Sequence, residues 1–207
     1  MSFRDCGIVL QFLFSITALT CCLTPNAHGQ SKLTGKDVLF VVARQDFRDE
    51  ELFAPQEVLK AAGYTTHIAS SKTGKLSGAL GGSADAEMTI DQVNPLDYAA
   101  IIFVGGAGSK EYWDNPTAHD IARNALIGDR IVGAICIAPV TLSNAGILKG
   151  KNATVFSSEI DTIKRGGAIY TGKPVEVDGN IVTGNGPGAA PDFGKEIAKL
   201  LKTKRGK

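Results

Sequence analysis

Short apolar runs alternate with helical spacings of apolar residues along most of this chain. The runs predict strands at 37–43, 65–69, 99–104, 130–135 and 153–156. Apolar residues that recur every three or four positions predict helices at 50–62, 116–127, 139–145 and 187–201. The stretch 70–83 is rich in glycine and serine, and residues 76–80 within it are predicted as a short hairpin arm.

The alternation of strands and helices predicts one α/β domain with a mostly parallel sheet that is covered on both faces. Asp178-Gly179 is a strong hairpin signal between two further strands, expected at 174–177 and 180–183. In sheets of this kind, functional sites lie at the carboxyl ends of the strands. Three loops meet that condition, and they lie after Ala43, at Gly105-Gly106 and at Cys136.

Residues 1–29 differ from the rest of the chain. Arg4 precedes an apolar stretch from Gly7 to Leu23, and the small residues Ala27 and Gly29 occupy the two positions that a signal peptidase reads for cleavage after Gly29. This pattern resembles a secretory signal peptide, and an uncleaved membrane anchor is the alternative because the stretch is nearly long enough to span a bilayer. We therefore expect a secreted or periplasmic protein with a signal peptide at 1–29, a linker at 30–35, a domain at 36–202 and a basic tail at 203–207.

Composition and charge are those of an ordinary globular protein, with 43% hydrophobic and 21% charged residues. A formal net charge of +1 gives no electrostatic reason to expect a nucleic-acid partner, and we expect no membrane association once the leader is removed. Of the four cysteines, only Cys136 lies outside the leader. A single cysteine in an oxidising compartment is a candidate reactive thiol.

Cys136 follows an apolar run and stands between Ala134 and Ala138, which allow a strand and a helix to approach each other closely. A strand that ends on a nucleophile flanked by small residues predicts a nucleophile elbow. A thiol at the start of a helix also experiences the positive end of the helix dipole, which favours the thiolate. The alternative interpretation is a buried core cysteine, and the local sequence does not decide between the two.

The other two loops contain groups that can assist a reaction at the thiol. Glu50 and Glu51 open the first predicted helix, where they either complement the helix dipole or place one carboxyl group beside Cys136 to move a proton. The turn at 105–108 either is a plain strand-to-helix turn or directs backbone N–H groups at a developing oxyanion. Glu111 stands where a third glycine would complete a dinucleotide-binding motif, so this turn predicts no such cofactor.

Histidine is scarce outside the leader. His67 falls on a predicted strand and is interpreted as structural, whereas His119 falls on a predicted helix and is a candidate partner of Cys136. No spacing of cysteine and histidine indicates a metal site. The sequence therefore predicts neither a metal ion nor another cofactor.

Four segments together resemble the DJ-one/ThiJ/PfpI superfamily. They are 41–43 with Glu51 to Pro55, then 104–106, then 134–139, and last 184–188. The resemblance extends from about Lys36 to Leu201, and the cysteine segment is its most specific part. It implies an α/β fold, a flavodoxin-like three-layer sandwich with a mostly parallel sheet and a nucleophile-elbow cysteine, in a protein that usually forms homodimers.

The resemblance also implies roles for particular residues. By position, Glu51 is the glutamic acid that contacts the Cys136 thiol, and Gly106 and Ile137 supply backbone N–H groups beside it. Known members of the superfamily include cofactor-independent glyoxalases, proposed deglycases, chaperones, oxidation sensors and PfpI-type peptidases.

This sequence departs from the superfamily pattern at two places. Ile137 follows the cysteine where PfpI-type peptidases often carry histidine, and the absence of that base argues against peptidase activity. Residues 157–159 stand where many relatives place a histidine, so Ser158 and Glu159 are further candidates near the thiol, together with His119. Glu159 either replaces that histidine as an acid or base, or caps a helix.

From these features we predict a cysteine-dependent enzyme that acts on a small reactive carbonyl compound, in the manner of a glyoxalase or deglycase. The Cys136 thiolate would attack the carbonyl carbon, Glu51 would move the proton, and the two backbone N–H groups would hold the oxyanion. The alternative is a non-catalytic redox sensor or chaperone with an oxidisable cysteine. A third interpretation, a PfpI-type cysteine peptidase, requires a histidine or carboxylate from a neighbouring subunit.

Overall fold

A computed structural model of the protein describes residues 35–205. The predicted signal peptide or membrane anchor at 1–29 lies outside the described residues, as do residues 30–34 of the predicted linker. Among the described helices, none combines the length and apolar character needed to cross a membrane. Cleavage of the leader and export of the protein remain predictions.

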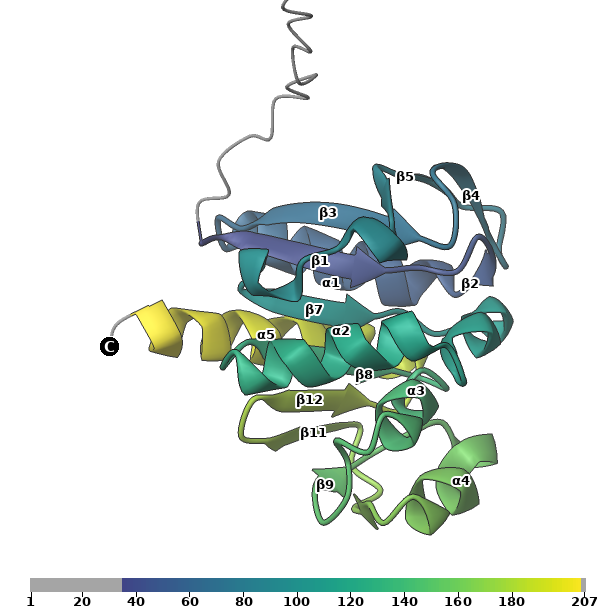
Figure 1. The fold of residues 1–207 in the computed structure, drawn as a ribbon, viewed down its shortest axis with the longest axis vertical. Helices are drawn as coiled ribbons and strands as arrows, with labels where there is room; N and C mark the ends of the chain where they lie inside the picture. Colours follow the sequence, from purple (N-terminus) through teal and green to yellow (C-terminus); the bar gives the residue numbers. More distant parts are fainter. Residues whose placement is uncertain (1–34, 206–207) are drawn as a thin grey trace, which may run out of the picture. The chain divides into compact units, whose positions relative to one another are not determined.

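A seven-stranded sheet forms the centre of the domain, in the order β11-β12-β8-β7-β1-β3-β6 (Figure 1). Its strands are β1 (Asp37–Val41), β3 (Thr65–Ser70), β6 (Met88–Thr89), β7 (Ala100–Phe103), β8 (Ile131–Ile135), β11 (Val175–Asp178) and β12 (Ile181–Gly184). All neighbouring pairs are parallel except β11 and β12, which form the predicted hairpin. Gly179 in its turn has a φ of +62°, a conformation that glycine adopts without steric cost.

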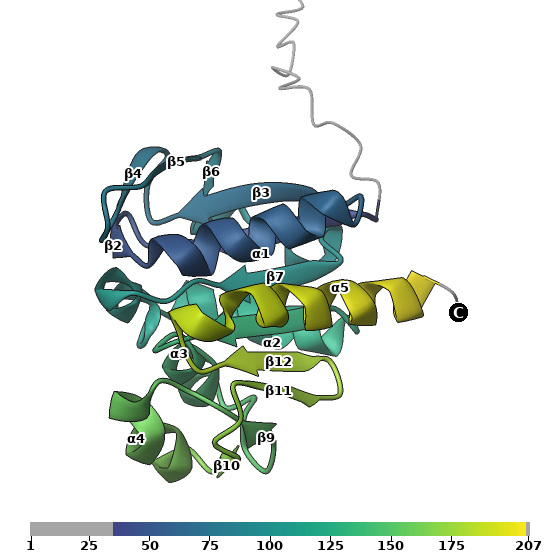
Figure 2. The ribbon, with the colours of Figure 1, turned by 180° about the vertical axis from the view of Figure 1, so that it is seen from behind.

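Helices cover both faces of this sheet (Figures 1 and 2). Helices α1 (Asp49–Ala61) and α5 (Ala190–Arg205) lie side by side on one face. Helices α2 (Pro116–Ile127) and α3 (Pro139–Asn144) lie on the other face, and the short α4 (Ile160–Arg165) packs beside α3. This arrangement is the three-layer α/β sandwich that the sequence predicts.

The alternation of side chains along β1 divides the core into two layers. Val38 and Phe40 join the apolar cluster that includes residues of α1 and α5, whereas Leu39 and Val41 join the cluster on the side of α2. Successive strand residues point to opposite faces, so a sheet covered on both sides requires a continuous apolar run. The run at the start of the domain is fully buried for this reason.

Two predicted elements differ from the structure. The strand expected at 153–156 is reduced to β9 (Asn152–Ala153), which pairs with β10 (Ile169–Tyr170) outside the main sheet. The Thr154 N–H instead donates to the Thr183 hydroxyl at 2.9 Å, so a side chain replaces the pairing of a longer strand. The last helix begins after a 3-10 turn (Pro187–Ala189), and residues 203–205 of the predicted basic tail continue it.

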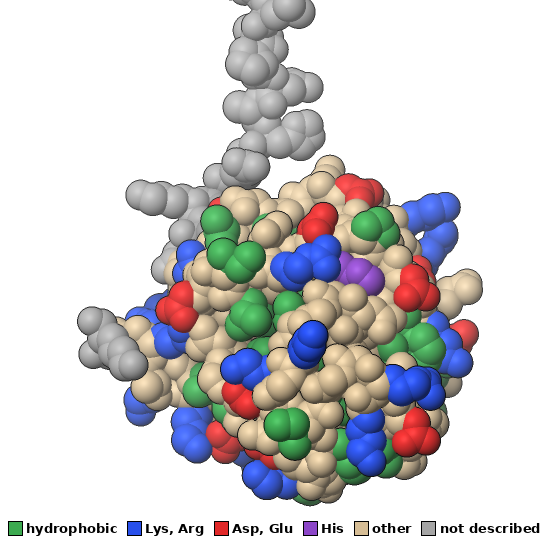
Figure 3. Space-filling model, turned by 60° about the horizontal axis from the view of Figure 1, so that its bottom comes forward, with side chains coloured by type: hydrophobic (Ala, Val, Ile, Leu, Met, Phe, Trp, Pro, Cys, Tyr) green, Lys and Arg blue, Asp and Glu red, His purple; other side chains and the backbone are tan. Residues whose placement is uncertain are grey.

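A second, three-stranded sheet lies beside the main one and joins β2 (Gln45–Phe47), β4 (Gly74–Gly78) and β5 (Ser83–Ala86). Strands β4 and β5 are antiparallel, and they contain most of the predicted hairpin arm. On the face of the molecule shown in Figure 3, acidic and basic side chains are interspersed and hydrophobic ones are scattered. This mixture accords with the nearly balanced charge of the whole sequence.

Candidate active site

The carboxyl ends of β1, β7 and β8 meet at one edge of the sheet because the three strands are parallel, and the arrowheads of β1 and β7 point the same way in Figure 1. The segment after β1 leads into α1 and places Glu51 in the first turn of that helix. The loop after β7 contains Gly105 and Gly106, and Cys136 directly follows β8. Parallel pairing of three neighbouring strands thus brings three distant parts of the sequence to one place.

The backbone turns sharply at Cys136. Its φ of +64° is one of only three positive values found at non-glycine residues within residues 35–205. Such a conformation is strained for a residue with a Cβ and persists where the surroundings enforce it. Here the Cys136 N–H donates to the Gly184 carbonyl at 2.9 Å, and the Cys136 carbonyl accepts from the Phe156 N–H at 2.8 Å. This is the backbone geometry expected for the predicted elbow.

The Cys136 sulfur lies among polar groups from all three loops. The backbone N–H groups of Gly106 and Ile137 lie near enough to it to lower the pKa of the thiol. The Glu51 carboxyl group lies against the same sulfur. Cys136 is 8% exposed and Glu51 is fully buried. The structure therefore places beside the thiol the three groups that the resemblance assigns to it.

Burial dominates the electrostatics of Glu51. Loss of hydration raises its pKa to about 7, although the Cys136 thiol, the charge of Arg48 and the Gly105 N–H lower it. Neither carboxyl oxygen of Glu51 makes a hydrogen bond of strict geometry with a described residue. The contacts that lower its pKa are therefore looser than ordinary hydrogen bonds. A carboxyl group that titrates near neutrality can both give and accept a proton at physiological pH.

Burial also raises the pKa of the Cys136 thiol to about 12, and the negative charge of Glu51 is the next largest cause. Desolvation thus outweighs the two N–H contacts that favour a thiolate, so the pKa of the thiol is raised on balance. The Glu51 charge acts only after that carboxyl group has lost its proton. The two groups thus titrate as a pair, in which a thiolate forms most readily while Glu51 keeps the proton.

Glycine is required at both positions of the loop after β7. A Cβ on Gly105 would lie 2.5 Å from the Cys136 Cβ and would also collide with the Glu51 carboxyl group. Gly106 has a φ of +97°, and a Cβ there would collide with the backbone N–H of Arg48. The absence of side chains at 105 and 106 therefore allows the backbone to approach the sulfur closely.

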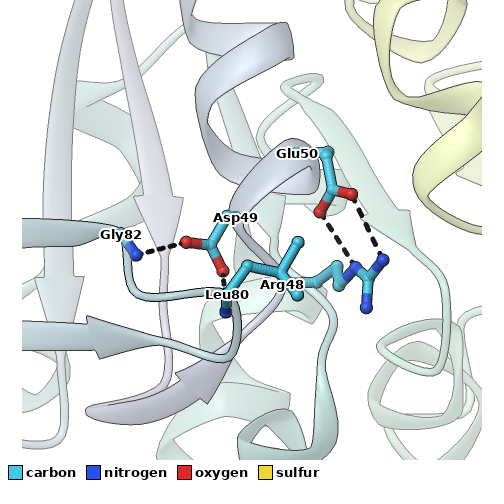
Figure 4. A network of polar contacts seen from close by, with 5 residues as sticks. All are labelled: Arg48, Asp49, Glu50, Leu80 and Gly82. Carbon is cyan, nitrogen blue, oxygen red and sulfur yellow. Dashed lines mark hydrogen bonds and ion pairs between the residues drawn. The ribbon is translucent and has the colours of Figure 1, made fainter.

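A polar network fixes the start of α1 beside the thiol (Figure 4). The Asp49 carboxylate accepts hydrogen bonds from the backbone N–H groups of Leu80 at 2.8 Å and Gly82 at 2.6 Å. A Cβ on Gly82 would collide with this carboxylate, so glycine is needed for the contact. Asp49 therefore ties the turn between β4 and β5 to the segment that carries Glu51.

The two candidate glutamates have separate partners. Glu50 binds the Arg48 guanidinium through two hydrogen bonds of 2.9 and 3.2 Å, which Figure 4 shows in front of the helix start. Glu51, one position later, points into the interior toward Cys136. Consecutive helix residues point about 100° apart, so one glutamate faces solvent while the next reaches the thiol.

A pocket of about 450 Å³ opens at the sulfur. Cys136 and Glu51 lie in its lining, together with the cationic Arg48 and Lys110 and the apolar ring of Phe156. Its volume is in the range of pockets that hold small molecules. The thiol is therefore largely buried and still borders space that a small substrate can enter.

The further candidates differ in their positions. Ser158 and Glu159 line the same pocket, where the Glu159 carboxylate accepts hydrogen bonds from the hydroxyl groups of Ser158 at 3.1 Å and Thr162 at 3.0 Å. His119 is not in the lining of this pocket, and its Nε2 lies 2.7 Å from the Trp113 carbonyl oxygen. The structure thus brings Glu159 to the pocket and leaves His119 outside it.

Sequence reasoning missed two aromatic residues of the site. Trp113 donates its indole N–H to the Ile137 carbonyl at 3.2 Å, and the Lys110 ammonium lies 5.3 Å from the centre of its ring. Phe156 forms one wall of the pocket and is 41% exposed. Trp113 is the only tryptophan in the chain and follows the glycine-rich turn, which is the one sequence signal that points to it.

Among residues 35–205, no three His, Cys, Asp or Glu side chains are grouped so that they could hold a metal ion. The reactive groups at this site are the thiol, the Glu51 carboxyl group and the backbone N–H groups.

Comparisons with known proteins give one consistent result. The model of the DJ-1/PfpI family matches residues 36–200. An uncharacterized protein of Methanocaldococcus jannaschii is 42% identical over 198 residues, which cover 94% of this chain and 96% of that protein. The deglycase PfpI of Pyrococcus furiosus is 34% identical over 165 residues, which cover 80% of this chain and 99% of the enzyme.

Solved structures agree with the sequence comparison. A ThiJ/PfpI domain protein from Brachyspira murdochii has a TM-score of 0.81 and 32% identity, covering 82% of this chain and 98% of its own. The DJ-1beta protein of Drosophila melanogaster has a TM-score of 0.74 and 26% identity, covering 81% of this chain and 91% of its own. The similarity therefore extends over nearly all of the described domain.

Proposed function

Because this chain belongs to the DJ-1/PfpI family, we propose that it is a cysteine-dependent enzyme that converts a small reactive carbonyl compound, as a glyoxalase or deglycase does. One observation carries the proposal. The Cys136 sulfur borders a pocket and is contacted by two backbone N–H groups and by a carboxyl group with a pKa of about 7. Relatives named as deglycases, each 34% identical to this chain, support an enzymatic activity.

The proposed reaction begins with a 2-oxoaldehyde in the pocket. The Cys136 thiolate adds to the aldehyde carbon, so a carbon–sulfur bond forms and the carbonyl electrons move to oxygen, which takes the proton of Glu51. The Glu51 carboxylate then removes the hydrogen of that carbon as a proton and returns it to the neighbouring carbonyl carbon, while the hydroxyl proton of the adduct passes to the oxygen of that neighbouring carbonyl. The adduct becomes the thioester of a 2-hydroxy acid, because one carbon is oxidised while its neighbour is reduced.

Hydrolysis completes the proposed cycle. Water cleaves the thioester, which releases the 2-hydroxy acid and restores the thiol. The reaction consumes one water molecule and needs no external oxidant or reductant. The N–H groups of Gly106 and Ile137 contact the sulfur in the free protein, and we assign them first to the thiolate and then to the adjacent oxyanion.

The test uses methylglyoxal as substrate and D- or L-lactate as the measured product. Wild-type protein is expected to form lactate, and Cys136→Ser is expected to reduce the rate to that of buffer. Glu51→Gln keeps the shape of the carboxyl group and removes its proton transfer, so the same loss is expected. Equal rates for wild type and Cys136→Ser would exclude methylglyoxal conversion at this thiol.

A redox sensor or chaperone remains the second candidate function, and the same contacts favour it. A sulfinate at Cys136 would accept hydrogen bonds from the two N–H groups and from protonated Glu51. Intact mass after mild peroxide treatment distinguishes the candidates. A gain of two oxygens mapped to Cys136, with no turnover of any carbonyl compound, would favour the sensor over the enzyme.

We also propose that the mature protein is a homodimer outside the cytoplasm. The motif resemblance supports the dimer, and the pattern of residues 1–29 supports export. Native mass spectrometry of the purified protein tests the first statement. N-terminal sequencing of the protein recovered from its source tests the second, with a new N-terminus at Gln30 as the expected result.

A further inference from the structure

A second pocket lies next to the thiol pocket. It has a volume of about 290 Å³ and shares two lining residues, Phe156 and Pro187, with the pocket at Cys136. Phe156 and Pro187 therefore border both cavities, the space at the sulfur and the second space beside it.

The position of Phe156 is fixed relative to the sulfur. Its N–H donates to the Cys136 carbonyl at 2.8 Å, so the two residues are joined through their backbones. Its ring packs against Gly186, where an added Cβ would lie 3.2 Å from the ring. The ring is nevertheless 41% exposed, which means that it is not an essential part of the packed core.

The second pocket has a chemical character of its own. Its lining combines the apolar Val155 and Pro187 and the ring of Tyr170 with the polar Ser157 and Asn185. Within the described part of the chain, no acidic or basic side chain lines it. An uncharged group can enter such a space without leaving a charge unpaired, whereas a carboxylate or phosphate would lose its hydration without compensation.

We propose that Phe156 determines which carbonyl compounds reach Cys136, and that the second pocket is a latent subsite for an uncharged substituent of about the size of an aromatic ring. This inference rests on the proposed function, because it identifies the substituent carried by the substrate. With the Phe156 ring in place, the substituent of a bound 2-oxoaldehyde is confined to the thiol pocket. Removal of the ring joins the two pockets and admits larger ones.

The experiment compares two 2-oxoaldehydes in the full-length protein. Methylglyoxal gives lactate and has a methyl substituent, whereas phenylglyoxal gives mandelate and has a phenyl substituent. Phe156→Ala is expected to raise the ratio of kcat/KM for phenylglyoxal to that for methylglyoxal by about tenfold or more, the range that pocket size achieves in discrimination. Phe156→Tyr retains the ring, so its ratio is expected to stay with the wild type.

Phe53→Ala is the matched control. Phe53 has nearly the same exposure, 38%, but it packs on Phe47 and lines neither pocket. Its replacement is expected to leave the ratio of the two substrates unchanged. An unchanged ratio in Phe156→Ala, or an equal rise in Phe53→Ala, would overturn the assignment of Phe156.

A second measurement does not depend on turnover. Cys136 is alkylated with iodoacetamide or with the bulkier N-phenylmaleimide, and each rate is followed on the Cys136 peptide by mass spectrometry. Phe156→Ala is expected to raise the rate with N-phenylmaleimide relative to that with iodoacetamide. An unchanged ratio of the two rates would contradict the proposal that Phe156 separates the two pockets. If the wild type converts no 2-oxoaldehyde, the proposed function fails, while these alkylation rates still decide whether Phe156 separates the pockets.

Discussion

Each end of the parallel sheet buries a carboxyl group, and the two carboxyl groups differ in their hydrogen-bond partners. At the amino end, Asp37 is 4% exposed and lies 2.9 Å from the Nε2 atom of His67, whose Nδ1 atom lies 2.9 Å from Glu87. At the carboxyl end, Glu51 is fully buried and has no hydrogen bond of strict geometry with a described residue. One carboxyl group thus has a basic partner, and the other has only a thiol and loose N–H contacts.

The pKa shifts express this difference. Burial alone would lower the pKa of His67, but its hydrogen bonds to Glu87 and Asp37 outweigh burial and raise it. Burial raises the pKa of Glu51 to about 7 because its contacts do not compensate for lost hydration. The amino end therefore stabilises its charges, whereas the carboxyl end disfavours one. Unfavourable burial of this kind is typical of sites that transfer protons.

The largest expected effect comes from adding one methyl group at the carboxyl end. Gly106→Ala places a Cβ against backbone at a φ of +97°, so strain and collision combine and should lower the free energy of unfolding by more than about 3 kcal/mol. Gly146→Ala is the matched control, because its φ is +81° and nothing lies within 4 Å of an added Cβ. It should cost about 1–2 kcal/mol.

Urea unfolding and methylglyoxal turnover measure this pair of variants. Gly106→Ala should also lose activity, since its N–H contacts the Cys136 sulfur. Gly146→Ala should retain activity under conditions in which it is folded. Equal losses of stability in the two variants would show that Gly106 is not closely packed against the backbone of residues 46–48.

The next effect concerns the cost of the Glu51 charge. A raised carboxyl pKa means that the folded protein binds more protons than the unfolded chain between pH 4.5 and about 7, so stability falls as the pH rises through that window. Glu51→Gln removes this loss. The variant should be more stable than the wild type by about 3 kcal/mol at pH 8, with no such gain at pH 4.5.

Glu50→Gln is the control for this substitution. Glu50 is exposed to solvent and paired with Arg48, so its replacement should change stability by less than about 1 kcal/mol. Urea unfolding at the two pH values gives both comparisons. A Glu51→Gln variant that is less stable than the wild type at pH 8 would show that the carboxylate is stabilised by its surroundings, contrary to the contrast between the two ends.

A smaller effect is expected in the reactivity of Cys136 with pH. Below a pH of about 7, Glu51 and Cys136 are both neutral, and the population with a single shared proton falls about tenfold for each pH unit. The rate of Cys136 alkylation by iodoacetamide should fall in the same proportion between pH 7 and pH 5. A rate that stays constant over this range would mean that the carboxyl group and the thiol do not titrate as a pair.

The sequence predicted those elements whose signals are local. Helix α2 has the expected bounds because Asn115 accepts the Ala118 N–H at its start and Pro116 occupies its first position. The β11–β12 hairpin follows from its Asp-Gly turn. The strand expected at 153–156 is wrong in extent, because the hydroxyl of Thr183, 29 residues away from Thr154, takes the hydrogen bond that pairing would use.

The site shows the same division between local and long-range signals. A short motif identifies Cys136, and the family resemblance identifies Glu51 as its partner, so their proximity could be predicted. The direction of the thiol pKa shift could not, because burial of Cys136 depends on the packing of three loops. Phe156 was missed for a similar reason, since nothing near it in the sequence shows that it borders two pockets.

The smallest expected effect belongs to the amino end. A histidine with a raised pKa adds stability that is complete below its unfolded pKa of about 6.5 and is lost as the pH rises through the folded value. His67→Gln should therefore destabilise the protein at pH 6 by about 1 kcal/mol or less, because Glu87 is half exposed, and by less at pH 9. Methylglyoxal turnover should not change, since His67 lies at the opposite end of the sheet from Cys136.

Urea unfolding of His67→Gln and Glu51→Gln over the same pH series then compares the two ends directly. The free energy of unfolding of each variant, relative to the wild type, should rise with pH. For Glu51→Gln the difference should rise from zero to a gain between pH 4.5 and about 7. For His67→Gln it should rise from a loss toward zero above a pH of about 6.5. The gain in Glu51→Gln would show that the buried Glu51 carboxylate opposes folding. The loss in His67→Gln would show that the buried Asp37 carboxyl group has a basic partner that supports folding. If His67→Gln were more stable than the wild type at pH 6, the amino end would oppose folding as well, and the two ends of the sheet would not differ in this respect.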